Sequence, residues 1–318
     1  MTSRLGAVIP VHGPIEPVLP LLNSLVGGST PSDGRPALVV VVDDATAEPV
    51  DPNALPPGVE LVRRATNGGF GAAVNTGLDR LAREGLDLAL VLNSDLRVPD
   101  GFVRDLVAHA QPWQPAVVGC RAEGPDGISG HSARYFPTAS HQIIEWLVPL
   151  ASQRHRDVLH RAVGHDMAAE RGTGMIPVDW VSGAVMLLPL TQVREVGGLD
   201  ELYFMYAEEV DLQRRLRAVG VPSLYDADLT VTHVGGGSSG GEARRRQWLV
   251  AGRDRYARLH GRPRTLRTGL RAAPLANLAW NTGRRVAGRD VAPLAAFREQ
   301  WGVISDAARG TVAERNRR

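Results

Sequence analysis

The apolar positions in the first 120 residues fall into short continuous runs, separated by stretches with helical spacing. Runs such as ALVVVV at 37–42 and LDLALVL at 86–92 are typical of central strands that are covered on both faces. Because strands and helices alternate, we expect an α/β fold with a mostly parallel sheet flanked by helices. The pattern predicts strands at 5–11, 37–42, 59–63, 86–92 and 116–120, and helices at 14–26, 71–83 and 99–110.

Beyond residue 120 the periodicity weakens, and it returns only near residue 178. The intervening segment contains turn residues and one amphipathic stretch at 140–150, and we interpret it as an insertion that shapes a substrate site. The apolar run VDWVSGAVMLLPL predicts one strand at 178–190, followed by a helix to 196. An arginine-rich helical pattern follows the aromatic residues at 203–206, and LTVTHV predicts a last strand.

The single cysteine, Cys120, excludes an internal disulfide, which fits a reducing compartment. The N-terminal apolar run is too short for a secretory signal and is interrupted by Pro10 and Pro14. No run of about 18 apolar residues occurs, so we expect no membrane span. These features predict a cytoplasmic protein.

Charge divides the chain near residue 243. Residues 244–318 contain 18 arginines and 5 acidic residues, a net charge of +13, whereas residues 1–243 carry −11. We therefore expect an acidic body at 1–243 and a basic helical extension at 244–318 that meets an anionic partner. Nucleic acid and the inner membrane surface both qualify, but apolar residues at helical spacing favour an amphipathic helix on the membrane over a nucleic-acid arm. These residues are Leu266, Leu270, Leu275, Leu278 and Trp280. The alternative is a solvated surface of closing helices.

Acidic and amide residues follow two of the predicted strands. Asp43 and Asp44 end the second strand, and Asn93, Ser94 and Asp95 end the fourth. In open α/β sheets ligands bind beyond the carboxyl ends of the strands. A carboxylate there can accept a hydrogen bond from a nucleoside, or hold Mg²⁺ together with phosphate oxygens. Because Asn93 supplies a neutral oxygen, Asp95 is the better cation ligand. The alternative is that these are ordinary turn residues.

Two further features suit a phosphate or cation site. The stretch NGGFGAAVNTGL at 67–78 places glycines at a helix start, where backbone N–H groups favour phosphate, although its spacing matches neither a dinucleotide motif nor a P-loop. His233 follows the last predicted strand, and a neutral imidazole there could complete a cation site. The alternative for His233 is a polar residue at a strand end.

Glu208 and Glu209 open the helical pattern that follows the aromatic residues. Acidic residues in a first helical turn suit the helix dipole, which is a purely structural explanation. The other explanation is a general base held in a pocket. Ser182 and Gly183 offer a close backbone approach, and Trp180 offers a ring on which a sugar can stack, or else a core aromatic.

These pieces, in this order, resemble glycosyltransferase family 2. The matching stretches are AVIPVHG, VVVVDDAT, NGGFGAAVNTGL, LVLNSDLRVPDGF, WVSGAVMLLPLTQVREVGGLDELYFMYAEEVDLQRRLRAVG and THVGGGSS, which together cover residues 4 to about 260. The resemblance is strongest to bacterial cell-wall rhamnosyltransferases, which move rhamnose from dTDP-rhamnose to a lipid-linked acceptor. It implies a GT-A fold with a nucleotide-sugar half at 1–120 and an acceptor-binding, catalytic half at 121–243. It also implies an inverting transfer in a single displacement.

The resemblance also assigns roles to individual residues. Asp95 falls on the metal-binding position with His233 beside it, Glu209 on the catalytic base, and Glu208 on an acceptor-binding position next to it. Two departures stand out, because Asn93 replaces an acid and Glu209 replaces the usual aspartate, which lengthens the base by one methylene. The expected nucleotide-binding residues are Pro10, His12, Asp43, Asp44, Asn67, Gly71, Asn75, Asn93 and Ser94. The expected acceptor-binding residues are Trp180, Ser182, Gly183 and Glu208.

Three other classes remain to be weighed. A non-catalytic sugar-nucleotide binding module would have the same fold but no use for the Glu208–Glu209 pair. A nucleotidyltransferase usually has a glycine-rich loop with arginine and lysine after the first strand, whereas the sequence here is Pro10-Val11-His12-Gly13 and the chain has no lysine. The glycine spacing disfavours a Rossmann dehydrogenase. Sequence does not choose between rhamnose, galactofuranose, mannose and glucose, between dTDP and UDP, or between Mg²⁺ and Mn²⁺.

Overall fold

The computed structural model describes residues 4–27, 34–153, 156–235 and 241–308. The chain forms two compact units. The first comprises Met1–Tyr135, Ala168–Glu201 and Glu208–Ser238, and the second comprises Phe136–Met167, Leu202–Ala207 and Ser239–Arg318. This division differs from the expected boundary near residue 243, because two internal segments leave the body of the chain and pack with the C-terminal helices.

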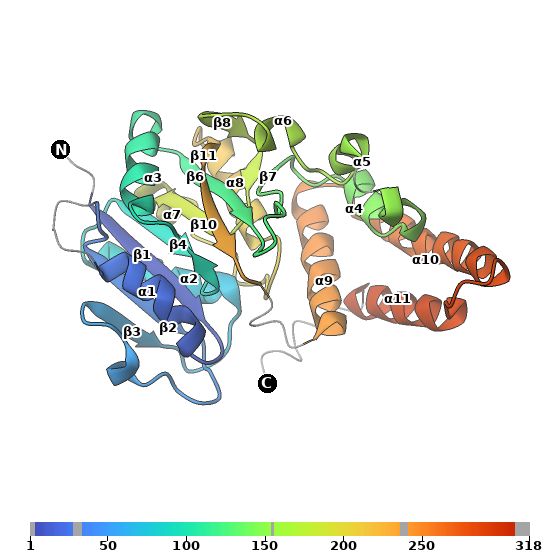
Figure 1. The fold of residues 1–318 in the computed structure, drawn as a ribbon, viewed down its shortest axis with the longest axis horizontal. Helices are drawn as coiled ribbons and strands as arrows, with labels where there is room; N and C mark the ends of the chain where they lie inside the picture. Colours follow the sequence, from blue (N-terminus) through green and yellow to red (C-terminus); the bar gives the residue numbers. More distant parts are fainter. Residues whose placement is uncertain (1–3, 28–33, 154–155, 236–240, 309–318) are drawn as a thin grey trace. The chain divides into compact units, whose positions relative to one another are not determined.

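A mixed sheet forms the centre of the first unit (Figure 1). Nine strands of the described residues contribute to it, in the order β3-β2-β1-β4-β10-β6-β11-β5, with β8 paired to β11. The first four of these are parallel to one another, whereas β10 runs antiparallel to both β4 and β6. The strands are β1 (Leu5–Val11), β2 (Leu38–Asp43), β3 (Val59–Arg63), β4 (Leu88–Leu92), β5 (Leu96–Arg97), β6 (Val117–Glu123), β8 (Met175–Val178), β10 (Val185–Pro189) and β11 (Ser223–His233). The predicted α/β architecture with a mostly parallel sheet is therefore confirmed.

Helices cover both faces of this sheet. On one face lie α1 (Leu19–Val26) and α3 (Phe102–Ala110), and on the other lie α2 (Phe70–Arg83), α7 (Leu190–Glu195) and α8 (Glu208–Ala218) (Figure 1). Shorter elements are η1 (Glu16–Val18), η2 (Pro52–Ala54), η3 (Gln111–Trp113) and α6 (Met167–Glu170). The predicted helix at 14–26 is thus divided into a 3-10 turn and a shorter α-helix.

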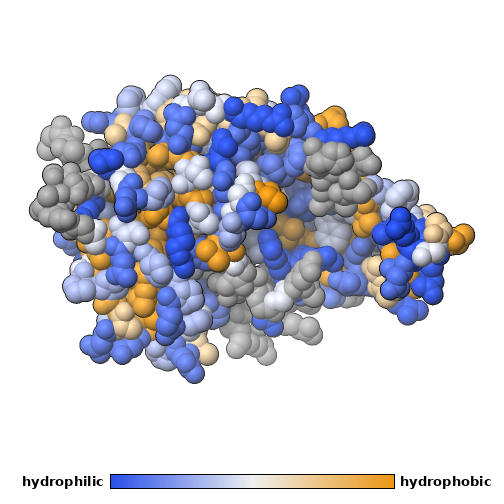
Figure 2. Space-filling view, viewed as in Figure 1, coloured by the Kyte–Doolittle hydropathy of each residue, from blue (hydrophilic) through white to orange (hydrophobic). Residues whose placement is uncertain are grey.

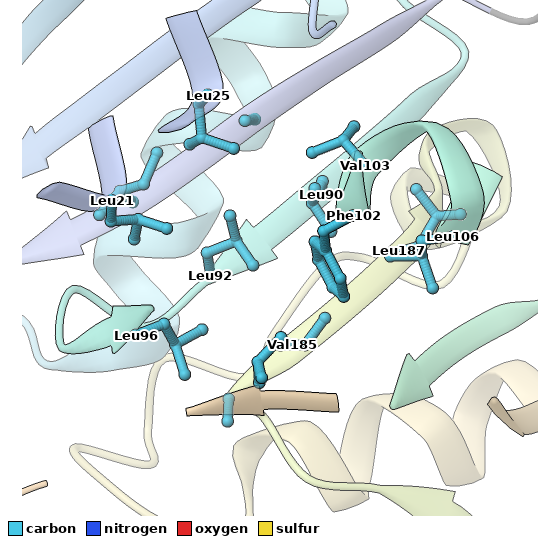
Figure 3. Close-up of a cluster of buried hydrophobic side chains, with 14 of the residues drawn as sticks. Leu21, Leu25, Leu90, Leu92, Leu96, Phe102, Val103, Leu106, Val185 and Leu187 are labelled. Atoms are coloured by element: carbon cyan, nitrogen blue, oxygen red, sulfur yellow. The ribbon is translucent and has the colours of Figure 1, made fainter. Parts of the chain in front are cut away.

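Each sheet face has its own hydrophobic core because successive strand residues point to opposite sides. In β1, Ile9 belongs to the core under α1 and α3, and Val8 belongs to the core under α2 and α8. Figure 3 shows the first of these cores, in which Phe102 of α3 lies among leucines of β4 and Val185 and Leu187 of β10. Burying one such side chain contributes about 1.5–3 kcal/mol, so the many buried residues fix the sheet firmly.

The predicted single strand at 178–190 is wrong. The structure divides it into β8, a short β9 (Trp180–Val181) and β10, and β9 pairs with β7 (Ala133–Arg134) in a separate two-stranded sheet. Ser182 and Gly183 form the break between β9 and β10. An apolar run does not reveal such a break, because Val178, β9 and β10 are all buried.

The second unit is helical. Its elements are α4 (Ala139–Glu145), η4 (Val148–Gln153), α5 (Asp157–Ala162), α9 (Glu242–His260), α10 (Pro263–Val286) and α11 (Pro293–Ala308). The expectation that Leu266 and Leu270 face a membrane is wrong, because both are buried in the core of this unit with Val250 and Ile304. None of the described helices combines the length and the apolarity that spanning a bilayer requires.

Buried polar groups stabilise the second unit from within. Asp254 of α9 is 4% exposed and accepts hydrogen bonds from Arg258 and from Arg267 of α10. Burial acts to raise the pKa of Asp254, but the two guanidinium groups outweigh it, and the pKa lies below its ordinary value. Asn277 of α10 donates to the Trp146 carbonyl and accepts from the Val148 amide, so α10 is fixed to the α4–η4 segment.

Candidate active site

The carboxyl ends of β1, β2 and β4 lie at one edge of the sheet, since these strands are parallel. Because β10 is antiparallel to β4 and β6, and β11 is parallel to β6, the end of β11 lies at the same edge. The topology therefore brings the residues at the carboxyl ends of β1, β2, β4 and β11 to one edge of the sheet.

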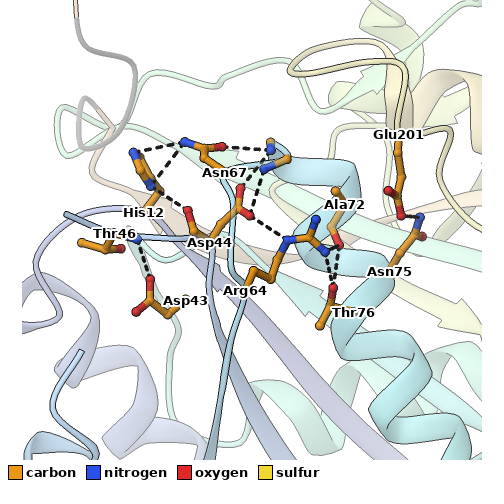
Figure 4. Close-up of polar contacts among 12 residues, drawn as sticks. His12, Asp43, Asp44, Thr46, Arg64, Asn67, Ala72, Asn75, Thr76 and Glu201 are labelled. Carbon is orange, nitrogen blue, oxygen red and sulfur yellow. Dashed lines mark hydrogen bonds and ion pairs between the residues drawn. The ribbon is translucent and has the colours of Figure 1, made fainter. Parts of the chain in front are cut away.

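Asp44 connects the end of β2 to the glycine-rich start of α2 (Figure 4). Its Oδ1 accepts hydrogen bonds from Arg64 Nε at 2.8 Å and from the Gly68 amide at 3.1 Å, and its Oδ2 accepts from the Gly69 amide at 2.9 Å. Arg64 also donates to the carbonyl of Ala72 and the hydroxyl of Thr76. A carboxylate offers about four acceptor positions, so these three bonds leave one for a ligand donor.

Two more predicted residues lie beside Asp44. His12 donates from Nδ1 to the Asp44 carbonyl at 3.0 Å, and Asn67 Nδ2 lies 3.2 Å from His12 Nε2 (Figure 4). Pro10 lies near the end of β1, next to Val42 of β2. The structure thus groups His12, Asp44 and Asn67 in one polar cluster at the sheet edge.

Asp43 and Asn75 have other contacts. The fully buried Asp43 accepts from the amides of Thr46 and Val50 and forms an ion pair with Arg63. Burial would raise the pKa of Asp43, but these hydrogen bonds outweigh it and the pKa is lowered. The structure gives Asp43 the task of holding the loop after β2, and its direct role in nucleotide binding stays a prediction.

Asn75 connects α2 to the segment that precedes the acidic pair. Its Nδ2 donates to Glu201 (Figure 4) and to the Leu199 carbonyl, and its Oδ1 accepts from the Leu199 amide at 2.9 Å. These bonds occupy the side-chain amide. Asn75 therefore positions the 199–201 loop, and its predicted contact with a nucleotide stays untested.

Asp95 and His233 meet directly. Asp95 Oδ1 lies 3.0 Å from His233 Nε2, and Asn93 Nδ2 lies 3.5 Å from the same nitrogen. Backbone pairing sets this approach, because Leu96 of β5 pairs with His233 and the Val234 amide donates to the Asp95 carbonyl. Burial acts to raise the pKa of Asp95, but the hydrogen bond and charge of His233 outweigh it, and the pKa is lowered.

This pair fits a divalent cation. A carboxylate oxygen is an ordinary ligand of Mg²⁺ or Mn²⁺, an imidazole nitrogen suits a transition metal such as Mn²⁺ better than Mg²⁺, and phosphate oxygens commonly complete such a shell. Ligands in neighbouring octahedral positions, each about 2.1 Å from the ion, lie about 3.0 Å apart. The observed spacing of 3.0 Å between Asp95 Oδ1 and His233 Nε2 matches that value.

The acidic pair begins α8, and its two side chains have different surroundings. Glu208 is 3% exposed and packs beside Gly71 at the start of α2, since a Cβ at Gly71 would lie 3.7 Å from Glu208 Cγ. Glu209 is half-buried and packs beside Gly183, where a Cβ would lie 3.5 Å from Glu209 Cγ. Gly183 therefore lies directly beside the Glu209 side chain.

A short chain of contacts connects Glu209 to the cation pair. Gly183, beside Glu209, precedes Ala184, whose carbonyl accepts from the Asn93 amide at 2.9 Å. Asn93 in turn lies against His233. The turn between β4 and β5 therefore contains Ser94 and the cation candidate Asp95, and its first residue, Asn93, is hydrogen-bonded to Ala184, which follows the residue beside Glu209.

Known proteins share both sequence and fold with this chain. The glycosyl transferase family 2 model matches residues 7–162. The chain is 29% identical over 248 residues to a Mycobacterium tuberculosis N-acetylglucosaminyl-diphospho-decaprenol L-rhamnosyltransferase, covering 73% of this chain and 76% of the relative. The chain carries a glycosyl transferase family 2 domain and is a glycosyltransferase.

Other relatives agree with this assignment. The transferase is 30% identical over 94 residues to the Escherichia coli rhamnosyltransferase WbbL, which covers 30% of this chain and 31% of that protein. It is 24% identical over 182 residues to the Haloferax volcanii low-salt glycan biosynthesis hexosyltransferase Agl10, which covers 56% and 52% of the two chains. GalNAc-T7, crystallised with UDP, GalNAc and Mn²⁺, shares the fold with a TM-score of 0.54 at 14% identity, over 81% of this chain and 48% of that one.

Sequence analysis did not find two residues that position the site of this transferase. Gln213, one turn after Glu209, is fully buried and exchanges two hydrogen bonds of 2.8 Å with the backbone of Val181. Arg64 spans from Asp44 to α2. The glutamine gave no sequence signal, whereas an arginine directly after β3, at the edge that carries Asp44, could have been noticed.

Trp180 of the transferase is 7% exposed, and its Nε1 donates to the Tyr135 carbonyl at 2.9 Å. The Arg134 guanidinium lies 5.5 Å from the centre of its ring. Ser182 donates its amide to the Ser132 carbonyl. Trp180 is therefore mainly a core aromatic that holds β9 against β7, and its contact with an acceptor sugar stays a prediction.

Proposed function

We propose that this transferase moves rhamnose from dTDP-rhamnose to a lipid-linked glycan acceptor, with inversion and with a divalent cation, in cell-envelope glycan synthesis. The observation that carries the proposal is the contact chain from Glu209 through Gly183 and Ala184 to Asn93 and His233. The similarity to the mycobacterial N-acetylglucosaminyl-diphospho-decaprenol L-rhamnosyltransferase supports the choice of sugar and acceptor.

The residues divide the work between the two ends of the donor. Asp44, held by Arg64, Gly68 and Gly69, offers its remaining acceptor position to the nucleobase. Asp95 and His233 would hold Mg²⁺ or Mn²⁺, which supplies positive charge to the leaving diphosphate. Glu209 accepts the proton of the acceptor hydroxyl as it attacks the opposite face of the sugar. The nearby Glu208 is buried against α2, and we assign it to orienting Glu209 and the acceptor.

Membrane attachment of the second unit completes the proposal. A lipid-linked acceptor lies in the bilayer, so the enzyme must reach the inner face of the cytoplasmic membrane. The C-terminal helices expose Leu275 at 54%, Trp280 at 46% and Val286 at 84%, and Arg285 and Arg289 are exposed beside them in the sequence. Figure 2 shows hydrophobic residues among hydrophilic ones over the surface. Apolar side chains mixed with arginines favour an anionic membrane surface over nucleic acid.

Two experiments test the proposal. A thermal-shift screen of dTDP-rhamnose, UDP-galactofuranose, GDP-mannose and UDP-glucose, each with Mg²⁺ or Mn²⁺, identifies the donor, because binding to the folded state raises the melting temperature. We expect dTDP-rhamnose with cation to give the largest shift. A larger shift with another donor would replace rhamnose by that sugar, and no shift with any of them would contradict the enzymatic proposal.

The second experiment tests Glu209 as the base. Glu209→Gln should lower kcat about a hundred- to ten-thousandfold for rhamnosyl transfer to N-acetylglucosaminyl-diphospho-polyprenol. Donor binding should remain, because the amide keeps the shape of the side chain. Full activity in this variant would favour the alternative, a module that binds sugar nucleotides without catalysis.

A further inference from the structure

The segment Leu202–Ala207 lies directly before the acidic pair in sequence but packs with the second unit. Three of its aromatic rings contact side chains of α9. The rings of Phe204 and Trp248 are 4.9 Å apart, Arg255 lies 5.2 Å from the centre of the Tyr203 ring, and Arg245 lies 5.9 Å from the centre of the Tyr206 ring. Aromatic and cation–π contacts of this kind fix the orientation of the rings. We call this set of contacts the α9 clamp.

The backbone of the segment also lies against α9. At Gly252 a Cβ atom would overlap the carbonyl oxygen of Tyr206, and it would lie 3.5 Å from the carbonyl oxygen of Met205. Gly252 is helical and needs no unusual dihedral angles, so close approach is what glycine provides there. Trp248 is 6% exposed, which places this contact in a buried part of the unit.

The end of the segment has a strained backbone. Tyr206 and Ala207 have φ angles of 71° and 77°, in the left-handed region that side chains other than glycine rarely adopt. Such a conformation persists only where the surroundings hold it in place. The residue bonded to Ala207 is Glu208, the first residue of α8.

We propose that the α9 clamp holds Tyr206 and Ala207 in this strained conformation and thereby, through the peptide bond to Glu208, sets the backbone conformation at which Glu208 and Glu209 begin α8. Gly252 and Trp248 are then positioning residues for the transfer reaction. This inference rests on the proposed role of Glu209 as the base. It explains why two consecutive residues in a functional segment carry positive φ angles without being glycine.

Three glycine-to-alanine variants of the full-length protein separate positioning from general damage. Gly252→Ala places a methyl group against the Tyr206 carbonyl. Gly269→Ala of α10 places one against Ile143 of α4, inside the same unit but away from the clamp. Gly302→Ala of α11 has no heavy atom within 4 Å of the added methyl group and serves as the neutral control.

We expect hydrogen–deuterium exchange of the peptide spanning 202–209 to rise in Gly252→Ala and not in the other two variants. With saturating dTDP-rhamnose and N-acetylglucosaminyl-diphospho-polyprenol, kcat of Gly252→Ala should fall about tenfold to a hundredfold, with the donor KM nearly unchanged. Trp248→Ala should reproduce both effects, and Trp248→Phe should restore most of the activity. Equal effects of Gly252→Ala and Gly269→Ala on exchange and kcat would overturn the inference.

The Glu209→Gln variant distinguishes a failure of the α9 clamp inference from a failure of the proposed role of Glu209 as the base. If Glu209→Gln is inactive while Gly252→Ala behaves like Gly269→Ala, the clamp is wrong and the base assignment stands. If Glu209→Gln keeps its activity, the base assignment fails. Gly252 and Trp248 then position no catalytic base, whatever the hydrogen–deuterium exchange shows.

Discussion

The Nε2 atom of His233 lies 3.0 Å from Oδ1 of Asp95, although His233 ends β11 and Asp95 follows β4. We predict that Asp95→Ala lowers kcat about a hundredfold or more. The substitution removes a proposed ligand of the divalent cation, whose positive charge would stabilise the leaving diphosphate. His233→Ala should instead raise the cation concentration needed for half-maximal activity by about tenfold to a hundredfold. Titration of activity with Mg²⁺ and with Mn²⁺ measures both effects. The exposed Asp100→Ala is the control, and wild-type cation dependence in Asp95→Ala would contradict the assignment.

Gln213 should support both stability and catalysis. Replacing it by leucine leaves the amide and the carbonyl of Val181 without their hydrogen-bond partner in a buried place, which costs about 2 kcal/mol in the free energy of unfolding. Since Gln213 and Glu209 share one face of α8, kcat should fall as well. Urea unfolding and steady-state kinetics measure the two effects. A stable variant with unchanged kcat would show that the link between α8 and β9 is dispensable.

The ion pairs of Asp254 should make the second unit sensitive to acid. Its folded-state pKa lies below the ordinary value of 3.8, so the unfolded state binds the proton first as pH falls. The stabilisation is therefore complete above about pH 5 and is lost as pH falls through the lowered folded-state pKa. We expect Asp254→Asn to melt below wild type at pH 7, with a difference that shrinks towards pH 3. The exposed Asp290→Asn should show no such trend. A difference that is independent of pH would contradict this explanation.

Membrane binding should depend on exposed side chains of α10 rather than on the presence of the helix. Removing the chain beyond Gly261 would also remove Leu266 and Leu270 of the hydrophobic core and Arg267, which binds Asp254. A truncated protein could then lose membrane binding simply because its second unit unfolds. Point substitutions avoid this problem.

We therefore predict that the double variant Leu275→Ser, Trp280→Ser, and separately Arg285→Ser with Arg289→Ser, weakens sedimentation with vesicles rich in anionic lipid. Each arginine near the surface contributes about 1 kcal/mol, so the arginine pair should cost roughly tenfold or more in affinity. Added salt should weaken wild type more than the arginine variant. Wild-type sedimentation by both variants would exclude this surface as the attachment site.

The sequence predicted the strands of the first half well, because the continuous apolar runs at β2 and β4 are compatible only with strands that are covered on both faces. It predicted less where hydrogen bonds between distant residues decide the structure. Gln213 reads as an ordinary helical residue, and only the fold brings it to Val181. Charge counting placed a boundary near residue 243, whereas packing assigns residues 136–167 and 202–207 to the helical unit. The strand ends carried the clearest chemical signal, and they lie at one edge as parallel strands require.

The two-residue ladder between β5 and β11 has a consequence for metal exchange. Since Leu96 pairs with His233 through the backbone, the two proposed ligands approach each other before any ion arrives. A preformed site loses little conformational freedom on binding, and chelation should not unravel the sheet that holds it. Removing the cation with a chelator should then abolish activity reversibly. Adding the cation back should restore turnover without a refolding step.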